Sequence, residues 1–166
     1  MDVANRGWVL SHADKLKGKV LEIGSWIAPG QEAIQCRDHV SKLENVIEYV
    51  GLDMREGPGV DVVCDAKNTS YPDNTWDVII CLDTLEHVDW PRDLVREAAR
   101  ILKKGGHLFL ASVMNFPIHD YPCDYYRYTP AAITLLLQDA GLEPMDVKGF
   151  GAIDFPGIVR GIGIKL

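Results

Sequence analysis

The chain has 166 residues, of which 47% are hydrophobic and 25% charged, with 24 acidic against 17 basic side chains and a formal net charge of −7. This length suits a single domain over residues 1–166 with a real hydrophobic core, and the composition excludes disordered, collagen-like and disulfide-scaffold proteins. The acidic balance lacks the basic footprint that phosphate binding requires, so we do not expect nucleic acid as a partner.

Short apolar segments, each bounded by polar or small residues, predict the strands of a mostly parallel sheet. In chain order they cover residues 20–23, 49–52, 60–64, 76–82 and 107–112. The first four end at Gly24, Asp53, Asp65 and Asp83, and the fifth follows the turn at Gly105–Gly106. Ligands of open parallel sheets bind beyond such strand ends, so these positions are the first candidates for a site.

Amphipathic segments between the strands predict the helices. They cover residues 3–16, 30–44, 90–103 and 129–140. The last begins with Thr129 as a cap and Pro130 at the first helical position, and it closes at Gly141.

Two features depart from the regular alternation. Only residues 54–59, which include Gly-Pro-Gly, separate the second and third strands, so either the third strand is very short or the crossover is a bare loop. The late segments 145–148 and 158–166 are joined by a link too short for a parallel crossover, which predicts a hairpin. We therefore predict an α/β, Rossmann-like, doubly wound and mostly parallel sheet with an antiparallel C-terminal hairpin and helices on both faces.

The strand-end residues have both a ligand-binding and a structural interpretation. Asp53 stands where doubly wound nucleotide folds place a carboxylate for ribose hydroxyls, although an aspartate there can also form a turn. Gly24 would let the backbone approach a ligand closely, or serve the turn alone. Asp65 and Asp83 repeat the arrangement at the next two strands, which favours a ligand site.

Five motifs follow one another along the chain. They are Val20–Gly24, Gly51–Asp53, Cys64–Ala66, Trp76–Val88 and Arg100–Leu108. Together they resemble the successive motifs of class I S-adenosylmethionine-dependent methyltransferases, close to the small-molecule "type 11" branch, over roughly residues 18–166. The resemblance implies an enzyme that moves a methyl group from S-adenosyl-L-methionine to a hydroxyl or amine of a small acceptor.

The same resemblance implies which residues hold the cofactor. Glu22 and Gly24 would lie by the methionine moiety, Asp53 would hold the ribose hydroxyls, and Asp65 would accept from the adenine amino group. The full implied set is Glu22, Gly24, Ser25, Gly30, Asp53, Met54, Asp65, Ala66, Leu82 and Asp83. A cleft lined by acids suits a ligand that carries a sulfonium and an ammonium group.

The first turn departs from the family pattern. Between Glu22 and Gly30 the chain has one early glycine followed by bulky residues, so either Pro29–Gly30 supplies a second tight turn or the loop is remodelled. This departure keeps a non-catalytic S-adenosylmethionine-binding regulatory or partner subunit open as an alternative. A nicotinamide-dependent oxidoreductase would need Gly-x-Gly-x-x-Gly at this turn, which is absent.

The acceptor side is predicted from two histidines and one unusual segment. His119 is the first candidate base, followed by His87, whose alternative role is to hold its loop through a backbone hydrogen bond. Residues 116–129 are dense in aromatic and charged side chains, which favours a substrate wall. From this segment we expect Tyr125 in catalysis and a substrate-binding set of Asp120, Tyr121, Tyr126 and Arg127. The structural alternative is that the tyrosines pack the loop and Arg127 pairs with Asp124.

The remaining sequence signals concern metals, membranes and compartment. The four cysteines, Cys36, Cys64, Cys81 and Cys123, form no metal-ligand or redox spacing, so we expect buried thiols in a reducing cytoplasm and no metal site. No apolar stretch has the length of a membrane span, and the start does not resemble a leader. The sequence leaves open whether the chain forms a homo-oligomer or binds a partner protein.

Overall fold

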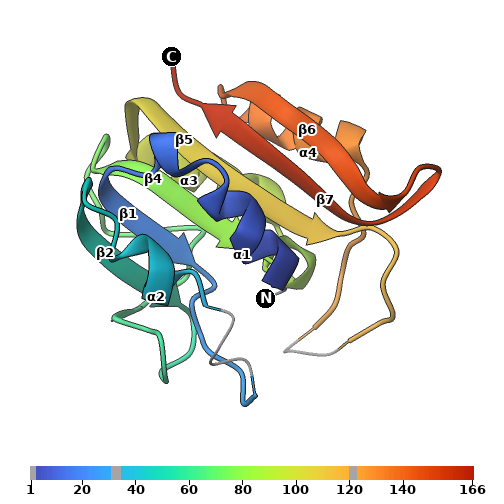
Figure 1. The fold of residues 1–166 in the computed structure, drawn as a ribbon, viewed down its shortest axis with the longest axis horizontal. Coiled ribbons are helices and arrows are strands. Elements are labelled where there is room, and N and C mark those ends of the chain that lie inside the picture. The colour runs from blue at the N-terminus through green and yellow to red at the C-terminus, as the bar shows by residue number, and fades with distance from the viewer. Residues whose placement is uncertain (1–2, 31–34, 120–122) are drawn as a thin grey trace.

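The computed structural model describes residues 3–30, 35–119 and 123–166, and within them seven strands form one sheet in the order β3-β2-β1-β4-β5-β7-β6 (Figure 1). The strands are β1 Gly18–Ile23, β2 Val46–Asp53, β3 Val62–Val63, β4 Trp76–Leu82, β5 Leu102–Val113, β6 Glu143–Ala152 and β7 Phe155–Ile164. Strands that are adjacent in the sheet pair in parallel along the part β3-β2-β1-β4-β5. Strand β7 pairs antiparallel with both β5 and β6. The predicted fold class is confirmed.

Two of the four predicted helices form nearly as expected. The helices are α1 Val3–Leu10, α2 Arg37–Val40, α3 Pro91–Ile101 and α4 Pro130–Asp139, with short 3-10 turns η1 Ala13–Lys15 and η3 Leu85–His87. At the start of α4, the hydroxyl of Thr129 accepts a hydrogen bond from the backbone N–H of Ala132, as a cap should.

The other two helix predictions are corrected. The expected helix over 3–16 ends at Leu10, because the Ser11 hydroxyl donates to the carbonyl of Trp8 and the chain turns there. Of the helix expected over 30–44, only α2 forms among the described residues, and residues 31–34 lie outside them.

The central strands of the sheet are buried on both faces, because α1 and α2 cover one face and α3 and α4 the other (Figure 1). Strand β4 shows why its sequence is continuously apolar. Val78 and Ile80 pack with the core on the side of α1, whereas Ile79 and Cys81 pack with the core on the side of α3.

The link between β2 and β3 contains no helix, and β3 has only two residues. Both alternatives considered from the sequence are therefore correct, since the third strand is very short and the crossover is a loop. The loop is anchored by Asp61, whose carboxylate accepts from the backbone N–H of Gly51 and pairs with Arg37. This edge of the sheet is therefore covered by loop residues only.

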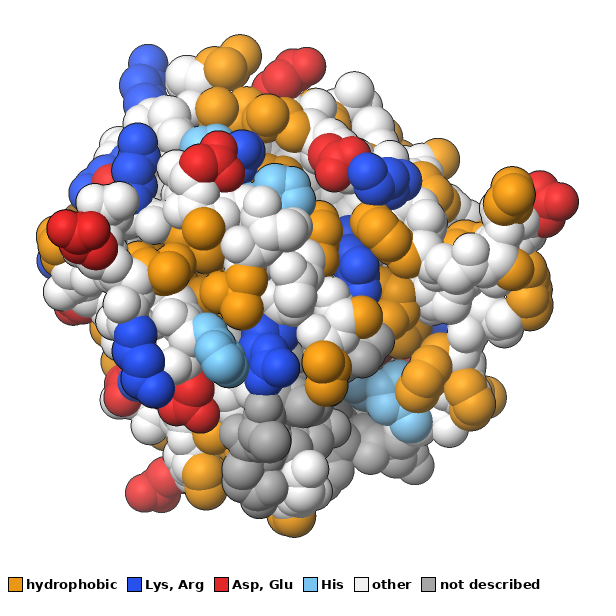
Figure 2. Space-filling view, viewed as in Figure 1, with side chains coloured by type: hydrophobic (Ala, Val, Ile, Leu, Met, Phe, Trp, Pro, Cys, Tyr) orange, Lys and Arg blue, Asp and Glu red, His pale blue; other side chains and the backbone are white. Residues whose placement is uncertain are grey.

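The length of the helices and the distribution of surface charge are both visible in the described residues. None of the helices in these ranges is both long and apolar enough to cross a bilayer. In the space-filling view, basic and acidic side chains are interspersed across the visible face (Figure 2). The cysteine prediction is partly wrong: Cys36 and Cys81 are buried, but Cys64 is half-buried and Cys123 is exposed.

Candidate functional site

A cavity of about 450 Å³ lies at the carboxyl ends of β1, β2 and β4. It sits where the strand order reverses between β1 and β4, which is where open α/β sheets bind ligands. Its volume falls in the range of small-molecule sites. One end of the cavity is formed by Asp53 and Asp65, and the other by Asp83, His87 and His119.

Seven of the ten predicted cofactor positions line this cavity. They are Gly24, Asp53, Met54, Asp65, Ala66, Leu82 and Asp83. The other three, Glu22, Ser25 and Gly30, do not line it: Glu22 and Ser25 are buried outside its wall, and Gly30 is exposed.

The carboxylate of Asp53 is held firmly at the end of β2. It is 4% exposed, and its Oδ2 accepts from the backbone N–H of Trp26 at 3.1 Å. Its Oδ1 accepts from both the backbone N–H and the Nε of Arg55 at 3.0 Å, and the guanidinium of Arg55 lies over the Trp26 ring at 4.2 Å. The sequence analysis missed Arg55 and Trp26, because stacking of one loop on another is a tertiary feature.

Gly24 forms the tight turn after β1. Its φ is +78°, a left-handed conformation that L side chains rarely adopt, and a Cβ there would run into the side chain of Thr84. Thr84 in turn donates to the carbonyl of Leu82 at 2.9 Å. The close approach of these two loops forms the floor of the cavity between its two ends.

Asp83 is oriented from the opposite side by the amino-terminal helix. Its backbone adopts a positive φ of +49°, and its Oδ1 accepts from the Nδ2 of Asn5 at 2.8 Å. The Oδ1 of Asn5 accepts from the Nε of Arg160 at 2.7 Å, and Asn5 is fully buried. Helix α1 therefore fixes a cavity carboxylate, a role that the sequence alone did not indicate.

Glu22 lies beneath the cavity in the packed interior. It is 2% exposed, and its Oε2 accepts from the hydroxyl of Tyr49 at 2.7 Å, whereas its Oε1 has no hydrogen-bond partner. Burial raises the pKa of Glu22 to about 7, although the Tyr49 hydrogen bond opposes the shift. The same burial raises the pKa of Tyr49 well above its usual value.

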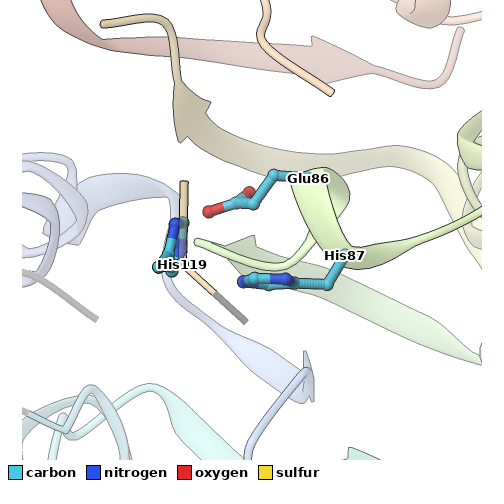
Figure 3. A group of neighbouring side chains, drawn as sticks. All are labelled: Glu86, His87 and His119. Atoms are coloured by element: carbon cyan, nitrogen blue, oxygen red, sulfur yellow. The ribbon is translucent and has the colours of Figure 1, made fainter. Parts of the chain in front are cut away.

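Three side chains converge beside the cavity, namely Glu86, His87 and His119 (Figure 3), and of these the two histidines line it. Their ligand atoms all lie within 4.8 Å of one another, and the two imidazole rings are 4.8 Å apart between centroids. Glu86 is fully buried, which raises the pKa of its carboxyl, and its Oε2 accepts from the hydroxyl of Ser112 at 2.6 Å. The sequence analysis named both histidines but not Glu86.

The tyrosine-rich segment clamps the turn that carries two of these residues. The Nδ1 of His87 lies 2.7 Å from the carbonyl of Cys123, and the backbone N–H of Tyr125 donates to the carbonyl of Glu86 at 2.7 Å. The hydroxyls of Tyr126 and Tyr128 donate to the carbonyls of Asp89 and Leu85, at 2.9 and 3.0 Å. Residues 123–128 are thus tied to residues 85–89 by side chains from both segments.

Most of the described part of the predicted substrate wall does not line this cavity, and its role in substrate binding stays a prediction. Of the described part of segment 116–129, only His119 lines the cavity, and Tyr125, Tyr126 and Arg127 do not. Arg127 pairs with Asp124 and donates to backbone carbonyls of its own loop, which is the structural alternative considered above. The remaining predicted residues, Asp120 and Tyr121, lie outside the described residues.

The cavity fits a cofactor that carries positive charge at one end and hydroxyls at the other. Carboxylates of Asp53, Asp65 and Asp83 line it, and Gly24 leaves its floor free of a side chain. The floor is otherwise apolar, with Ile23, Leu52 and Leu82 in the wall. Asp53 and Asp83, which the motif resemblance implies at the ribose and amino-group ends of the cofactor, therefore both line this cavity with carboxylates that accept hydrogen bonds.

Comparison with known proteins gives a family match and many structural matches. Residues 29–110 match the methyltransferase domain family. A ubiquinone biosynthesis O-methyltransferase from Marinobacter nauticus is 29% identical over 117 residues, which are 70% of this chain and 44% of that protein. The chain thus spans less than half the length of that relative.

Two solved structures illustrate the similarity of fold. A SAM-dependent methyltransferase from Aquifex aeolicus superposes with a TM-score of 0.67 at 20% identity, covering 95% of this chain and 88% of that chain. A 1,6-didemethyltoxoflavin-N1-methyltransferase from Burkholderia thailandensis, solved with S-adenosylhomocysteine, has a TM-score of 0.71 at 16% identity, covering 98% of this chain and 76% of that chain. At these identities, the likeness concerns the fold.

Proposed function

Because the chain belongs to the class I S-adenosylmethionine-dependent methyltransferases, we propose that it transfers a methyl group from S-adenosyl-L-methionine to a hydroxyl of a small molecule. The observation that carries this proposal is the cavity at the strand switch point, with carboxylates at one end and two imidazoles at the other. A hydroxyl is preferred to an amine because the relative from Marinobacter nauticus is named an O-methyltransferase.

At the cofactor end, Asp53 would bind the ribose hydroxyls and Asp65 the adenine amino group, with Met54 and Ala66 against the adenine ring. Asp83, oriented by Asn5, would face the cofactor's ammonium group. The cofactor supplies a methyl group on a sulfonium, whose leaving group needs no acid. The protein therefore has to hold the reactants in line and remove a proton from the acceptor.

At the acceptor end, an imidazole would take that proton. The Nδ1 atoms of His87 and His119 lie against oxygen acceptors, so the neutral rings carry their hydrogen there and leave Nε2 with a lone pair. His119 is the preferred base because it comes from the segment outside the sheet, where an acceptor can enter. His87 is the second candidate.

The test is turnover with methyl-labelled S-adenosylmethionine and a panel of small phenols, aliphatic alcohols and amines. We expect label on a hydroxyl and release of S-adenosylhomocysteine, and His119→Ala should lower turnover by about 10²–10⁴ while cofactor affinity stays nearly constant. Label on amines only would refute the proposal that the methyl acceptor is a hydroxyl. Cofactor binding without turnover on any acceptor would instead support the non-catalytic binding subunit.

We also propose that the domain over residues 1–166 works in the cytoplasm. None of the four cysteines forms a disulfide within the described part of the chain, which suits a reducing compartment. Because the acceptor end is bordered by a single loop, a second copy or a partner protein could complete its wall. Size-exclusion chromatography with light scattering, with and without cofactor, tests this part of the proposal: a monomer in both conditions contradicts a homo-oligomer.

A further inference from the structure

The cluster of Glu86, His87 and His119 has the composition of a metal site, although the sequence spacing predicted none. Two imidazoles and one carboxylate are a common ligand set for divalent transition metals. The three ligand atoms lie within 4.8 Å of one another, and Figure 3 shows the Glu86 carboxylate directed toward the His119 ring with His87 beside it. We propose that these three side chains bind one divalent first-row transition metal ion of the Zn²⁺ class.

Both histidines have the contacts on Nδ1 that a metal-bound imidazole needs. A metal-bound imidazole usually donates its other ring N–H to a carbonyl or carboxylate, which fixes the ring and raises its basicity. In His87 the Nδ1 donates to the carbonyl of Cys123 at 2.7 Å. In His119 the Nδ1 lies 3.1 Å from Asp124 Oδ2 and 3.2 Å from the carbonyl of Pro117. These contacts leave Nε2 of each ring as the atom that would bind an ion.

The side chains that orient His119 are themselves held in place by hydrogen bonds. Asp124 has a side chain that is 1% exposed, and its Oδ2 also accepts from the backbone N–H of His119 at 2.9 Å. Arg127 pairs with this carboxylate through both terminal nitrogens, which holds Asp124 in place. The role of Arg127 is thus to orient Asp124, which in turn orients His119.

Glu86 supplies the second, independent observation. Its side chain is fully buried, and while Oε2 accepts from Ser112, Oε1 has no hydrogen-bond partner among the described residues. A buried carboxylate oxygen without a donor is unfavourable, and a coordinated cation would satisfy it. The backbone around Glu86 is fixed by the N–H of Tyr125, so the carboxylate is presented from a constrained turn.

The distances allow closure around an ion. Metal–nitrogen bonds of about 2.0–2.1 Å in a tetrahedron place ligand atoms about 3.3 Å apart, so the present separations need to shrink by about 1.5 Å at most. Rotation of the imidazoles supplies that movement. Three protein ligands leave at least one coordination position, and because His87 and His119 line the cavity, that position opens into it and can take an oxygen ligand.

An ion and a general base are alternative uses of the same imidazoles, since a coordinated Nε2 cannot accept a proton. The metal site does not depend on the proposed methyl transfer, because its evidence is the donor set and its readout is metal binding. Affinity for S-adenosylhomocysteine, measured on the same metal-free protein, separates failure of one proposal from failure of the other.

The experiment titrates the chelator-treated, metal-free full chain with Co²⁺, followed by visible absorption, and then displaces it with Zn²⁺. We expect one equivalent to bind with d–d bands of a nitrogen and oxygen site. Glu86→Gln, which keeps the Ser112 hydrogen bond, and His119→Gln should each weaken binding at least about 100-fold, because even outer-shell partners change metal affinity by 10–100-fold.

Two matched variants control for adventitious binding. His39→Ala removes an exposed imidazole of α2 that lies outside the cluster, and Cys123→Ser removes an exposed thiol while leaving the carbonyl that His87 contacts. Both should bind Co²⁺ as the wild type does. The proposal is overturned if the wild type shows no saturable binding, if folded Glu86→Gln binds equally well, or if Cys123→Ser abolishes the signal.

Discussion

The buried carboxyl of Glu22 makes the stability of this fold depend on pH in a direction opposite to that of most acidic residues. Its pKa is about 7 in the folded protein against 4.5 for the unfolded chain, because burial disfavours the charged form. At about 1.4 kcal/mol for each pKa unit, this rise corresponds to about 3 kcal/mol. The contribution of Glu22 to the free energy of unfolding is therefore fully present below pH 4.5 and falls by about 3 kcal/mol as the pH rises to 7 and above.

Replacing Glu22 by Gln removes this dependence, since the amide stays neutral and its oxygen still accepts from Tyr49. Urea unfolding at pH 4.5, 6 and 8 measures the effect as the difference in unfolding free energy between variant and wild type, so that the other carboxylates cancel. That difference should grow in favour of the variant by about 3 kcal/mol from pH 4.5 to 8.

The matched control is Glu48→Gln, an exposed carboxyl on the same strand as Tyr49 that forms a surface pair with Lys19. Its difference from the wild type should stay within about 1 kcal/mol at every pH. A Glu22→Gln difference that is constant with pH would refute the assignment of a raised pKa to this carboxyl.

Three further substitutions test the walls of the cavity. Arg55→Ala should tighten S-adenosylhomocysteine binding up to about tenfold in calorimetry, because it frees an oxygen of Asp53 for the ribose; weaker binding would make Arg55 part of the cofactor site. Gly24→Ala should lower the unfolding free energy by at least about 1–2 kcal/mol, since φ is +78° and the new Cβ meets Thr84; an unchanged melting temperature would contradict this packing. Asn5→Ala should cost about 1–3 kcal/mol of stability, and cofactor affinity as well, because it removes two hydrogen bonds that orient Asp83 and Arg160; a loss confined to stability would separate α1 from the site.

The sheet could be predicted because its signals are local. Apolar runs that end in Asp53, Asp65 and Asp83 fix both the strands and the edge of the sheet where they end. Where local signals are weak, the predictions failed: α1 ends early because Ser11 competes for a backbone carbonyl, and the helix expected over 30–44 is reduced to α2 in its described part.

The candidate site was predictable at the cofactor end but only in part at the acceptor end. The density of tyrosine and arginine in segment 116–129 is visible in the sequence, but the partners of these side chains are not. Arg127 pairs with Asp124, and the hydroxyls of Tyr126 and Tyr128 donate to the carbonyls of Asp89 and Leu85, so these side chains hold the segment against residues 85–89. Glu86 was passed over because its burial beside Ser112 depends on β5 packing.

The most direct test of the proposed methyltransferase site is calorimetric titration of S-adenosylhomocysteine into the wild type and Asp53→Ala, with NADH as the competing ligand class. Asp14→Ala, which removes an exposed carboxylate that pairs with Lys15, is the matched control. We predict one site in the wild type, no binding of NADH, unchanged affinity in Asp14→Ala, and a loss of about 1–3 kcal/mol in Asp53→Ala. Binding of NADH without S-adenosylhomocysteine, or equal affinity in Asp53→Ala, would contradict the account.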